Sequence, residues 1–448
     1  MFNFFLSHSP ILYFTQSLWR DEAFSILTAE RPIGFFLTKL GLETPLYYTL
    51  LHFWIKLFGE SEIAVRSLSF LGFILATIVV IAWSEKLFKK HFLSWFLPVL
   101  FFFNPMLLYY AFEARAYAWY VLFTVLSLYT YTTKRWLWFT VSTILGFYTH
   151  SYFLIVPFVE TIHYLVAKNI NWKTFWKDAF VKSMSMSALV IVPWLIKITF
   201  GLSQLKSSWY FPVNFNLVRS VLGNMFIGYE GTPGYLWGFT AFVSLVLVAL
   251  FVWAMKPVAT RKRNALFLFL IGIPLAIVIG ISFKKPLFVN RYLIPVTVGE
   301  VILLALAIET LPRRWMQVLC ATVLLLFSIF FDTWYPPLHA KLNIRATLMQ
   351  VNVLKTRDDV IFAASPLIFF ETIYYSTDRT KVFLYNPMNG AFPWYVGDII
   401  VSRNQFARSW PTYPMRAFLV HEDGSYEIVY QTHAGIAKQV QPKSLTGP

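Results

Sequence analysis

Two neighbouring carboxylates near the start of the chain are the residues best suited to chemistry. Asp21 and Glu22 lie together in the segment 19–23, Trp-Arg-Asp-Glu-Ala. Partial removal from water makes a carboxylate a stronger base, so such a pair could take the proton of an acceptor hydroxyl. Acidic residues are also favoured in the first turn of any helix, where they complement the helix dipole. The spacing alone leaves both interpretations open.

A second set of polar residues stands at the breaks between apolar runs. Glu113 and Arg115 occur in Glu-Ala-Arg, His150 in Thr-His-Ser, and Arg291 in Asn-Arg-Tyr. Arginine can hold a phosphate through two parallel hydrogen bonds, so these positions are candidates to bind an anionic group. The alternatives are a solvated turn, a cation that reaches up to lipid headgroups, and a histidine with a structural role.

Motifs for nucleotide or thiol chemistry are missing from the sequence. It contains no glycine-rich phosphate loop, no His-Glu-x-x-His zinc signature and no cysteine cluster. The single cysteine, Cys320, lies inside an apolar run and can form no intrachain disulfide. No nucleotide cofactor is therefore expected.

The composition is that of an integral membrane protein. Hydrophobic residues make up 57% of the chain and charged residues only 13%, whereas about a quarter of a soluble protein is charged. The net charge of +16 does not indicate nucleic-acid binding, because the cations form short clusters between apolar runs rather than one basic face.

The lengths of the apolar runs predict about ten helical spans. A span needs about 20 residues, because a helix rises 1.5 Å per residue and the hydrocarbon layer is roughly 30 Å thick. The predicted spans are 65–84, 92–111, 116–133, 136–150, 151–167, 183–200, 235–255, 265–282, 291–309 and 315–331.

The distribution of cations predicts the orientation in the membrane. Short cytoplasmic loops carry an excess of lysine and arginine. One alternate set of loops is basic: Lys86, Lys89 and Lys90; Lys134 and Arg135; Lys168, Lys173, Lys177 and Lys182; Lys256, Arg261, Lys262 and Arg263; Arg313 and Arg314. These loops are predicted to be cytoplasmic. The segments then predicted to lie outside are residues 1–64, the breaks at 112–115, 201–234 and 283–290, and the tail from 332.

The first 64 residues are predicted to lie at the outer surface rather than to cross the membrane. The apolar stretch 2–14 has 13 residues, which reach only about 20 Å. Within 46–58, Thr49, His52 and Lys56 follow a 3, 4 spacing that places them on one helical face. This pattern is typical of a helix lying in the membrane interface, with His52 and Lys56 as candidates to face the acceptor.

The tail from about residue 340 changes to interspersed charged and polar residues. It contains strand-like segments at 360–363, 382–385, 398–401 and 416–420, with a plausible helix at 366–375. We therefore expect an α-helical polytopic membrane protein with a small extracytoplasmic α/β domain. The expected division is an outer loop at 1–64, a transmembrane domain at 65–331 and the α/β domain at 332–448.

The ordered motifs together resemble those of a known family. They are Asp-Glu at 21–22, Pro-Leu-Tyr-Tyr at 45–48, Gly-x-Ser-Glu at 59–62 with Arg66, Glu-Ala-Arg-x-Tyr at 113–117, Thr-His at 149–150 and Arg-Tyr-Leu-x-Pro at 291–295. Their order along the chain, and the side of the membrane on which they are predicted to lie, are similar to those of the GT-C membrane glycosyltransferases. The resemblance is to the protein-mannosyltransferase and aminoarabinose-transferase superfamily, in the RgtA/B/C/D-like branch. The resemblance covers roughly residues 17–310.

The resemblance implies an inverting transfer of a sugar from a polyprenyl-phosphate carrier to an acceptor at the outer face of the cell membrane. By carry-over, Asp21 is the general base, and Glu22 shapes the acceptor site or a bound metal. Glu113 matches the second acidic position near the donor phosphate. Arg115, His150 and Arg291 are candidate phosphate contacts. A divalent metal ion is a candidate cofactor, and the acceptor, whether protein, lipid or glycan, is not identified.

One feature departs from the family pattern. The family usually has a complete span before its Asp-Glu loop, whereas here only the stretch 2–14 precedes it.

Two other functions fit the sequence. A transporter or flippase of lipid-linked glycans would also be polytopic and hold phosphate-binding cations. A glycan polymerase or ligase of the outer leaflet would differ mainly in using a pyrophosphate-linked chain as donor.

Overall fold

The computed structural model describes residues 2–89, 91–168, 175–201, 212–228, 234–432 and 437–440. Of the cations named above, Lys90 and Lys173 lie outside these ranges. The chain divides into two compact units. The helical unit comprises residues 1–13, 40–47 and 66–338, and the mixed unit comprises residues 14–39, 48–65 and 339–448. Residues 14–39 and 48–64 of the expected outer loop belong to the same unit as the tail. The expected division into 1–64, 65–331 and 332–448 remains a prediction.

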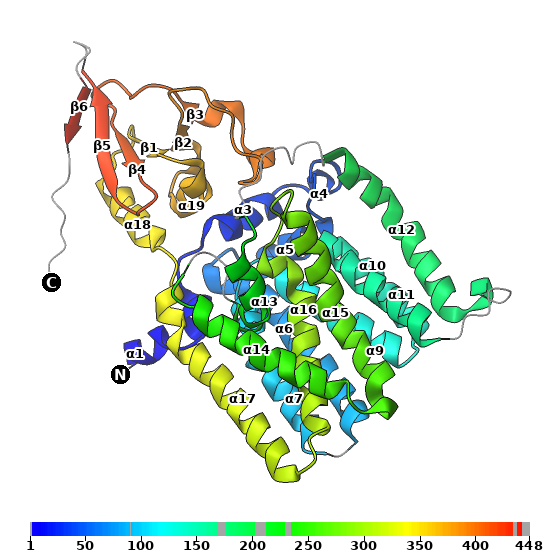
Figure 1. The fold of residues 1–448 in the computed structure, drawn as a ribbon. Helices are drawn as coiled ribbons and strands as arrows, with labels where there is room; N and C mark the ends of the chain where they lie inside the picture. The colour runs from blue at the N-terminus through cyan, green and yellow to red at the C-terminus, as the bar shows by residue number, and fades with distance from the viewer. Residues whose placement is uncertain are drawn as a thin grey trace. The chain divides into compact units, whose positions relative to one another are not determined.

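Apolar helices build the helical unit (Figure 1). In chain order they are α6 (Glu62–Phe88), α7 (Leu93–Phe102), α8 (Pro105–Ala111), α9 (Tyr117–Thr132), α10 (Trp136–Thr149), α11 (Ile155–Ala167), α12 (Ala179–Gly201), α13 (Phe215–Ile227), α14 (Trp237–Ala254), α15 (Val258–Ser282), α16 (Ile294–Glu309) and α17 (Arg314–Trp334). Every one of the ten predicted spans lies on one or two of these helices.

Not all of these helices are long enough to cross a bilayer alone. Among the described residues, six helices have sufficient length and hydropathy, and a seventh span forms if α7 and α8, which meet at a 54° bend, are counted as one. The helices α9, α10 and α11 are shorter than the usual span, so the count of ten remains a prediction. Leu189, Leu245 and Leu326 expose most of their side chains, as helices that face lipid do.

Helix α16 is the buried centre of the helical unit. All residues from Ile294 to Ile308 are buried, and the helix packs against α7, α9, α14 and α15. A helix that is apolar on every side can be stable only where neighbours surround it. The short 3-10 helix η4 (Asn290–Leu293) precedes it, so the packing of α16 also positions Arg291.

The first part of the chain forms short helices. Residues 2–14 form α1 (Phe2–Ser7) and most of α2 (Ile11–Thr15) instead of one continuous span, as their length predicts. They are followed by α3 (Arg20–Ala29), α4 (Ile33–Thr38) and α5 (Pro45–Phe58). The predicted helix at 46–58 is confirmed, and it stops at Gly59, whose φ of 80° lies in the left-handed region that glycine adopts without strain.

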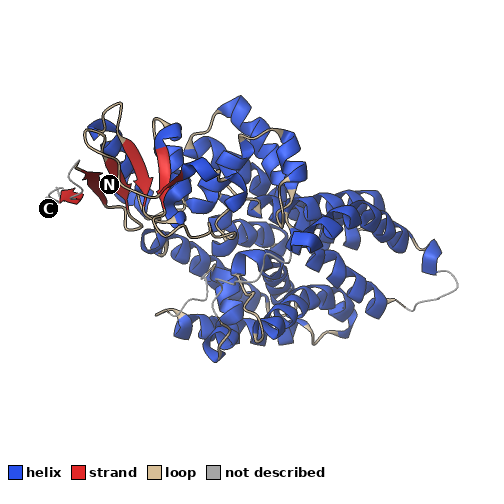
Figure 2. Cartoon of the chain, turned by 90° about the horizontal axis from the view of Figure 1, so that it is seen from above, coloured by secondary structure: helices blue, strands red, loops and turns tan. Residues whose placement is uncertain are grey.

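The tail contains a six-stranded sheet, to which the strands of the described residues belong. Figure 2 shows these strands in red. The order of the sheet is β3-β2-β1-β4-β5-β6, parallel from β3 to β4 and antiparallel from β4 to β6. The bounds are β1 (Val360–Ala363), β2 (Val382–Tyr385), β3 (Phe406–Ala407), β4 (Ala417–Val420), β5 (Tyr426–Gln431) and β6 (Ala437–Val440). Helix α19 (Phe369–Tyr375) packs on β1, β2 and α18 (Ile344–Leu354). The expected α/β domain is confirmed.

One predicted strand is wrong. Residues 398–401 do not form a strand but begin with the 3-10 helix η8 (Asp398–Ile400). The preceding Gly397 has a φ of 121°, which an extended strand does not use. The ring of Phe24 fills the space in which a Cβ would stand, with its Cδ2 at 2.4 Å. Packing of α3 residues against this turn therefore overrides the strand propensity of Ile399, Ile400 and Val401.

Candidate active site

Asp21 and Glu22 stand in the first turn of α3 but have different environments. The Asp21 carboxylate accepts a hydrogen bond of 3.0 Å from Nε of Arg20, and its side chain is 14% exposed. Glu22 is completely buried. Both are placed where the dipole of α3 favours negative charge, but only Asp21 has access to the surface of the mixed unit.

Glu22 is held by contacts within the mixed unit. Its carboxylate accepts a hydrogen bond from the backbone N–H of Trp19 at 3.3 Å, which is half of a capping box. Nζ of Lys341 lies 3.4 Å from the same carboxylate and 4.8 Å from the ring centre of Trp19. The backbone N–H of Lys341 donates to Oε1 of Gln16 at 2.9 Å. These contacts favour a structural role for Glu22 at the start of α3.

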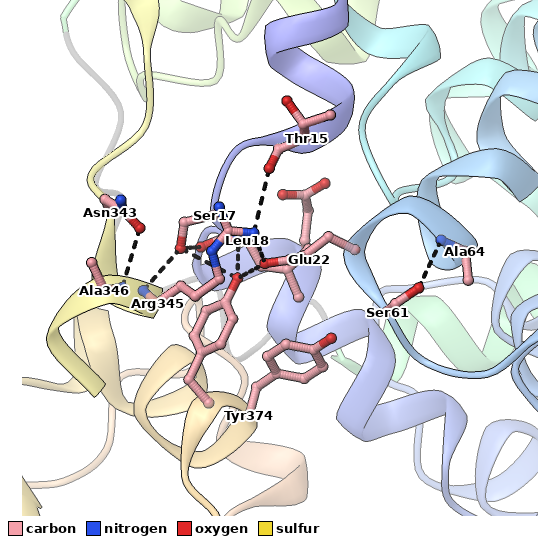
Figure 3. A network of polar contacts seen from close by, with 12 residues as sticks. Thr15, Ser17, Leu18, Glu22, Ser61, Ala64, Asn343, Arg345, Ala346 and Tyr374 are labelled. Atoms are coloured by element: carbon pink, nitrogen blue, oxygen red, sulfur yellow. Dashed lines mark hydrogen bonds and ion pairs between the residues drawn. The ribbon is translucent and has the colours of Figure 1, made fainter. Parts of the chain in front are cut away.

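Two residues of the tail, Tyr375 and Arg345, hold the segment before α3. Figure 3 shows Arg345 beside Ser17 and Leu18. The hydroxyl of Tyr375 accepts a hydrogen bond from the Leu18 backbone N–H at 2.7 Å and donates to Oε1 of Glu62 at 2.8 Å. Nη1 of Arg345 lies 2.9 Å from the same Glu62 oxygen, and its backbone N–H donates to Oγ of Ser17 at 3.3 Å. The tail thus sets the position of the chain just ahead of Asp21.

Glu371 on α19 is a buried carboxyl group beside the first turn of α3. Burial raises the pKa of Glu371 to about 8; the carboxylate of Asp21 adds to the increase, and the Arg20 guanidinium opposes it. A carboxyl group in this state is mostly protonated at neutral pH. Glu371 therefore places a neutral acid, rather than a second anion, next to Asp21.

The other two candidates in this unit lie on α5. His52 is buried, and its Nδ1 is 2.6 Å from the carbonyl oxygen of Ala29 at the end of α3. Lys56 is exposed. The contact of His52 connects α5 to α3, so its geometry favours a structural role, while the surface position of Lys56 agrees with an interfacial lysine.

The helical unit contains the other four candidates. Glu113 and Arg291 are buried, with 2% and 4% of their surface exposed. Nη2 of Arg115 lies 3.2 Å from Oε1 of Glu43, and the backbone carbonyl of Arg115 accepts a hydrogen bond of 3.2 Å from Oγ of Ser69. Glu43, two residues before the Pro-Leu-Tyr-Tyr motif, therefore holds the arginine of the Glu-Ala-Arg-x-Tyr motif.

His150 lies in an aromatic cage next to two guanidinium groups. Its ring stacks on Tyr120 at a centroid distance of 4.8 Å, and the ring of Tyr292 lies 5.5 Å away. Arg115 and Arg291 are close enough to interact electrostatically with the imidazole. Two buried or half-buried guanidiniums beside aromatic rings form a site in which an anionic group would be stabilised.

The predicted residues are divided between the two units. Arg115, His150 and Arg291 lie close together within the helical unit, which also contains Glu113. Asp21, Glu22, His52 and Lys56 belong to the mixed unit. Sequence reasoning missed three residues of the mixed unit, namely Lys341, Glu371 and Tyr375. They lie more than 300 positions from Asp21, and no local motif marks them.

A metal site is not evident in the described part of the chain. Among residues 2–89, 91–168, 175–201, 212–228, 234–432 and 437–440, no group of three or more His, Cys, Asp or Glu side chains could hold an ion. The divalent ion implied by the family resemblance remains a prediction.

Comparison with known proteins identifies the fold. The chain resembles the crystal structure of ArnT from Cupriavidus metallidurans bound to undecaprenyl phosphate, with a TM-score of 0.59 at 12% identity over 98% of this chain and 97% of that one. The apo structure of the same protein gives a TM-score of 0.49 at 10% identity over 92% and 91% of the two chains. No protein-family model and no curated protein sequence matches. The expected GT-C-like fold of a multi-pass membrane protein is confirmed.

Proposed function

We propose that this protein is an inverting glycosyltransferase that moves a sugar from a polyprenyl-phosphate donor to an acceptor at the outer face of the cell membrane. The observation that carries the proposal is the position of Asp21, a surface-accessible carboxylate in the first turn of α3, on a fold like that of ArnT, which was solved with undecaprenyl phosphate. The outer location of Asp21 is proposed because the basic loops, which are expected in the cytoplasm, lie at the other ends of the predicted spans.

In the proposed reaction, Asp21 acts as the general base. Its carboxylate accepts the proton of an acceptor hydroxyl while the hydroxyl oxygen forms a bond to the anomeric carbon of the donor sugar. The bond between that carbon and the phosphate oxygen breaks, and polyprenyl phosphate leaves with the bonding electrons. A direct displacement of this kind inverts the anomeric centre. Glu22 is completely buried, so Asp21 is the member of the pair that can receive a proton.

The guanidiniums of the helical unit are proposed to act on the leaving phosphate in the same reaction. Arg291 and Arg115 can form charge-assisted hydrogen bonds to phosphate oxygens, and these bonds strengthen as negative charge develops on the departing group. Glu43 orients Arg115 through the ion pair of 3.2 Å. The aromatic rings around His150 offer apolar surface to a lipid-linked substrate.

The test is sugar transfer by purified protein in liposomes that contain a polyprenyl-phosphate sugar, with Asp21→Asn compared to wild type. We expect the turnover number to fall by about 100-fold or more, because asparagine cannot accept the proton. Binding of the donor lipid should be retained. Full activity of Asp21→Asn would remove this residue as the base.

A matched control variant lies at the opposite end of α3. Glu30 is the residue after the helix, and it forms an ion pair of 2.8 Å with Arg379, as Asp21 does with Arg20. Glu30→Gln removes an acid–arginine pair of similar type without changing Asp21, so we expect less than about a threefold loss. Lipid movement across the bilayer without bond formation would instead favour the flippase alternative.

A further inference from the structure

A cavity lies in the helical unit, and none of the candidate catalytic residues lines it. It has a volume of about 740 Å³ and is formed by the ends of α6, α9, α10, α11 and α15 with the start of α12. Its lining includes Lys86, Lys134, Lys168 and Arg263. All four belong to loops or helix ends that the distribution of cations predicts to be cytoplasmic.

The cavity has an excess of positive charge. Asp178 is the acidic residue of its lining, and it is paired with Lys168. Arg263 is paired at 2.7 Å with Glu309. Lys86 donates a hydrogen bond of 2.7 Å to the hydroxyl of Tyr129. Within the described ranges, neither Lys86 nor Lys134 has a carboxylate partner, so two ammonium groups remain uncompensated.

Lys134 occupies a backbone position at which glycine is usually preferred. Its φ of 56° is left-handed, and the Arg135 N–H donates to the Thr130 carbonyl at 2.8 Å, as in the turn that ends many helices. A side chain there costs on the order of 1 kcal/mol relative to glycine. A lysine at this site places an ammonium group at the cavity in spite of that cost.

Most of the remaining lining is apolar or aromatic, and Thr132, Thr133 and His163 are its other polar residues. Trp83, Leu87 and Trp136 line the cavity together with Phe267. A small soluble anion would gain nothing from such walls, whereas the first carbons of an acyl chain would be removed from water there. Cations beside an apolar wall between helices at the cytoplasmic side are the chemistry that recognises an anionic lipid headgroup.

We propose that this cavity binds the phosphodiester headgroup of an anionic glycerophospholipid, with Lys86 and Lys134 as its cationic contacts. The site uses none of the residues assigned to sugar transfer, so lipid binding here does not depend on whether the protein transfers sugars. Its role is to couple the helical unit to the anionic lipid of the inner leaflet.

The test uses the full-length protein in a non-ionic detergent, titrated with phosphatidylglycerol or with phosphatidylcholine of the same chain length. Lipid adducts are counted by native mass spectrometry, and Tm is measured in parallel. We expect phosphatidylglycerol to bind and to raise Tm, and phosphatidylcholine to do neither. Lys134→Gln should weaken phosphatidylglycerol binding about fivefold, and Lys86→Gln should have a similar effect.

Lys89 provides the matched control. It also has a left-handed φ, of 43°, at the end of a helix, but it does not line the cavity. Lys89→Gln should change the affinity less than twofold. Equal binding of the two lipids, or equal effects of Lys134→Gln and Lys89→Gln, would overturn the proposal. The proposal would also be overturned if inorganic phosphate raised the Tm as much as phosphatidylglycerol does and lost this effect in Lys134→Gln. That result would assign the site to a soluble anion.

Discussion

Replacement of Lys341 by methionine tests whether the tail holds the Asp-Glu segment in place. Nζ of Lys341 lies 3.4 Å from the Glu22 carboxylate, and the two side chains are 12% and 0% exposed. Methionine keeps most of the length and the apolar stem of lysine but removes the charge. The Glu22 carboxylate then stays buried without this ammonium group.

The size of the effect follows from the burial of the pair. Removing one member of a fully buried pair costs about 3–5 kcal/mol, because the remaining charge keeps its desolvation penalty. Lys341 retains some exposure, so we expect the lower end, about 3 kcal/mol. The amides of α3 that exchange by local opening should then exchange on the order of a hundredfold faster.

Hydrogen–deuterium exchange of the detergent-purified protein, read by mass spectrometry over residues 20–29, is the assay. Lys39→Met is the control, since Lys39 is exposed in the same unit. The double variant Glu22→Gln, Lys341→Met should lose less stability than the two single variants lose in sum, because the neutral amide no longer needs the ammonium group. The reasoning is refuted if Lys341→Met exchanges like Lys39→Met or if the two changes are additive.

Three further predictions concern binding, pH and backbone conformation. Arg291→Lys should raise the KM for the lipid donor about tenfold in the liposome transfer assay, because lysine lacks the planar pair of donors. The Tm of the wild type should fall as the pH rises from about 4.5 through 8. Burial raises the pKa of Glu371 to about 8, so ionising this carboxyl group in the folded state costs on the order of 4 kcal/mol of stability. Glu371→Gln should remove this part of the decrease in Tm. Gly397→Ala should lower stability by about 2 kcal/mol or more in a thermal melt, because its Cβ would meet Phe24 Cδ2 at 2.4 Å and its φ is 121°.

Each of these predictions has a matched control and a contradicting outcome. Arg314→Lys changes an exposed arginine and should leave KM unchanged; equal effects of the two arginine variants would exclude the phosphate contact. Glu422 is exposed, so the pH dependence should survive in Glu422→Gln, and its survival in Glu371→Gln would contradict the assignment to Glu371. A Cβ on Gly390 meets only Asn386 Oδ1 at 3.7 Å, so Gly390→Ala should be neutral, and a neutral Gly397→Ala would contradict the steric argument.

The helices of the helical unit could be predicted because they depend on local sequence. The apolar runs at 235–255 and 265–282 became α14 and part of α15, and the polar spacing of Thr49, His52 and Lys56 predicted α5. The strands of the tail were harder. Val360–Ala363 and Val382–Tyr385 were predicted as they occur, but 398–401 was wrong, because contact of Phe24 with Gly397 decides that turn.

Sequence alone determined that this chain is a membrane protein and which of its residues could do chemistry. Both conclusions depend on quantities that are local along the chain, namely the length of an apolar run relative to the bilayer and the functional groups within a short motif. Only the tertiary structure decided that Glu22 is buried against Lys341, 319 positions away, while Asp21 stays accessible. Burial and ion pairing depend on residues that meet only when the chain folds, so the residue types around Asp21 could not show which of the two acids is buried.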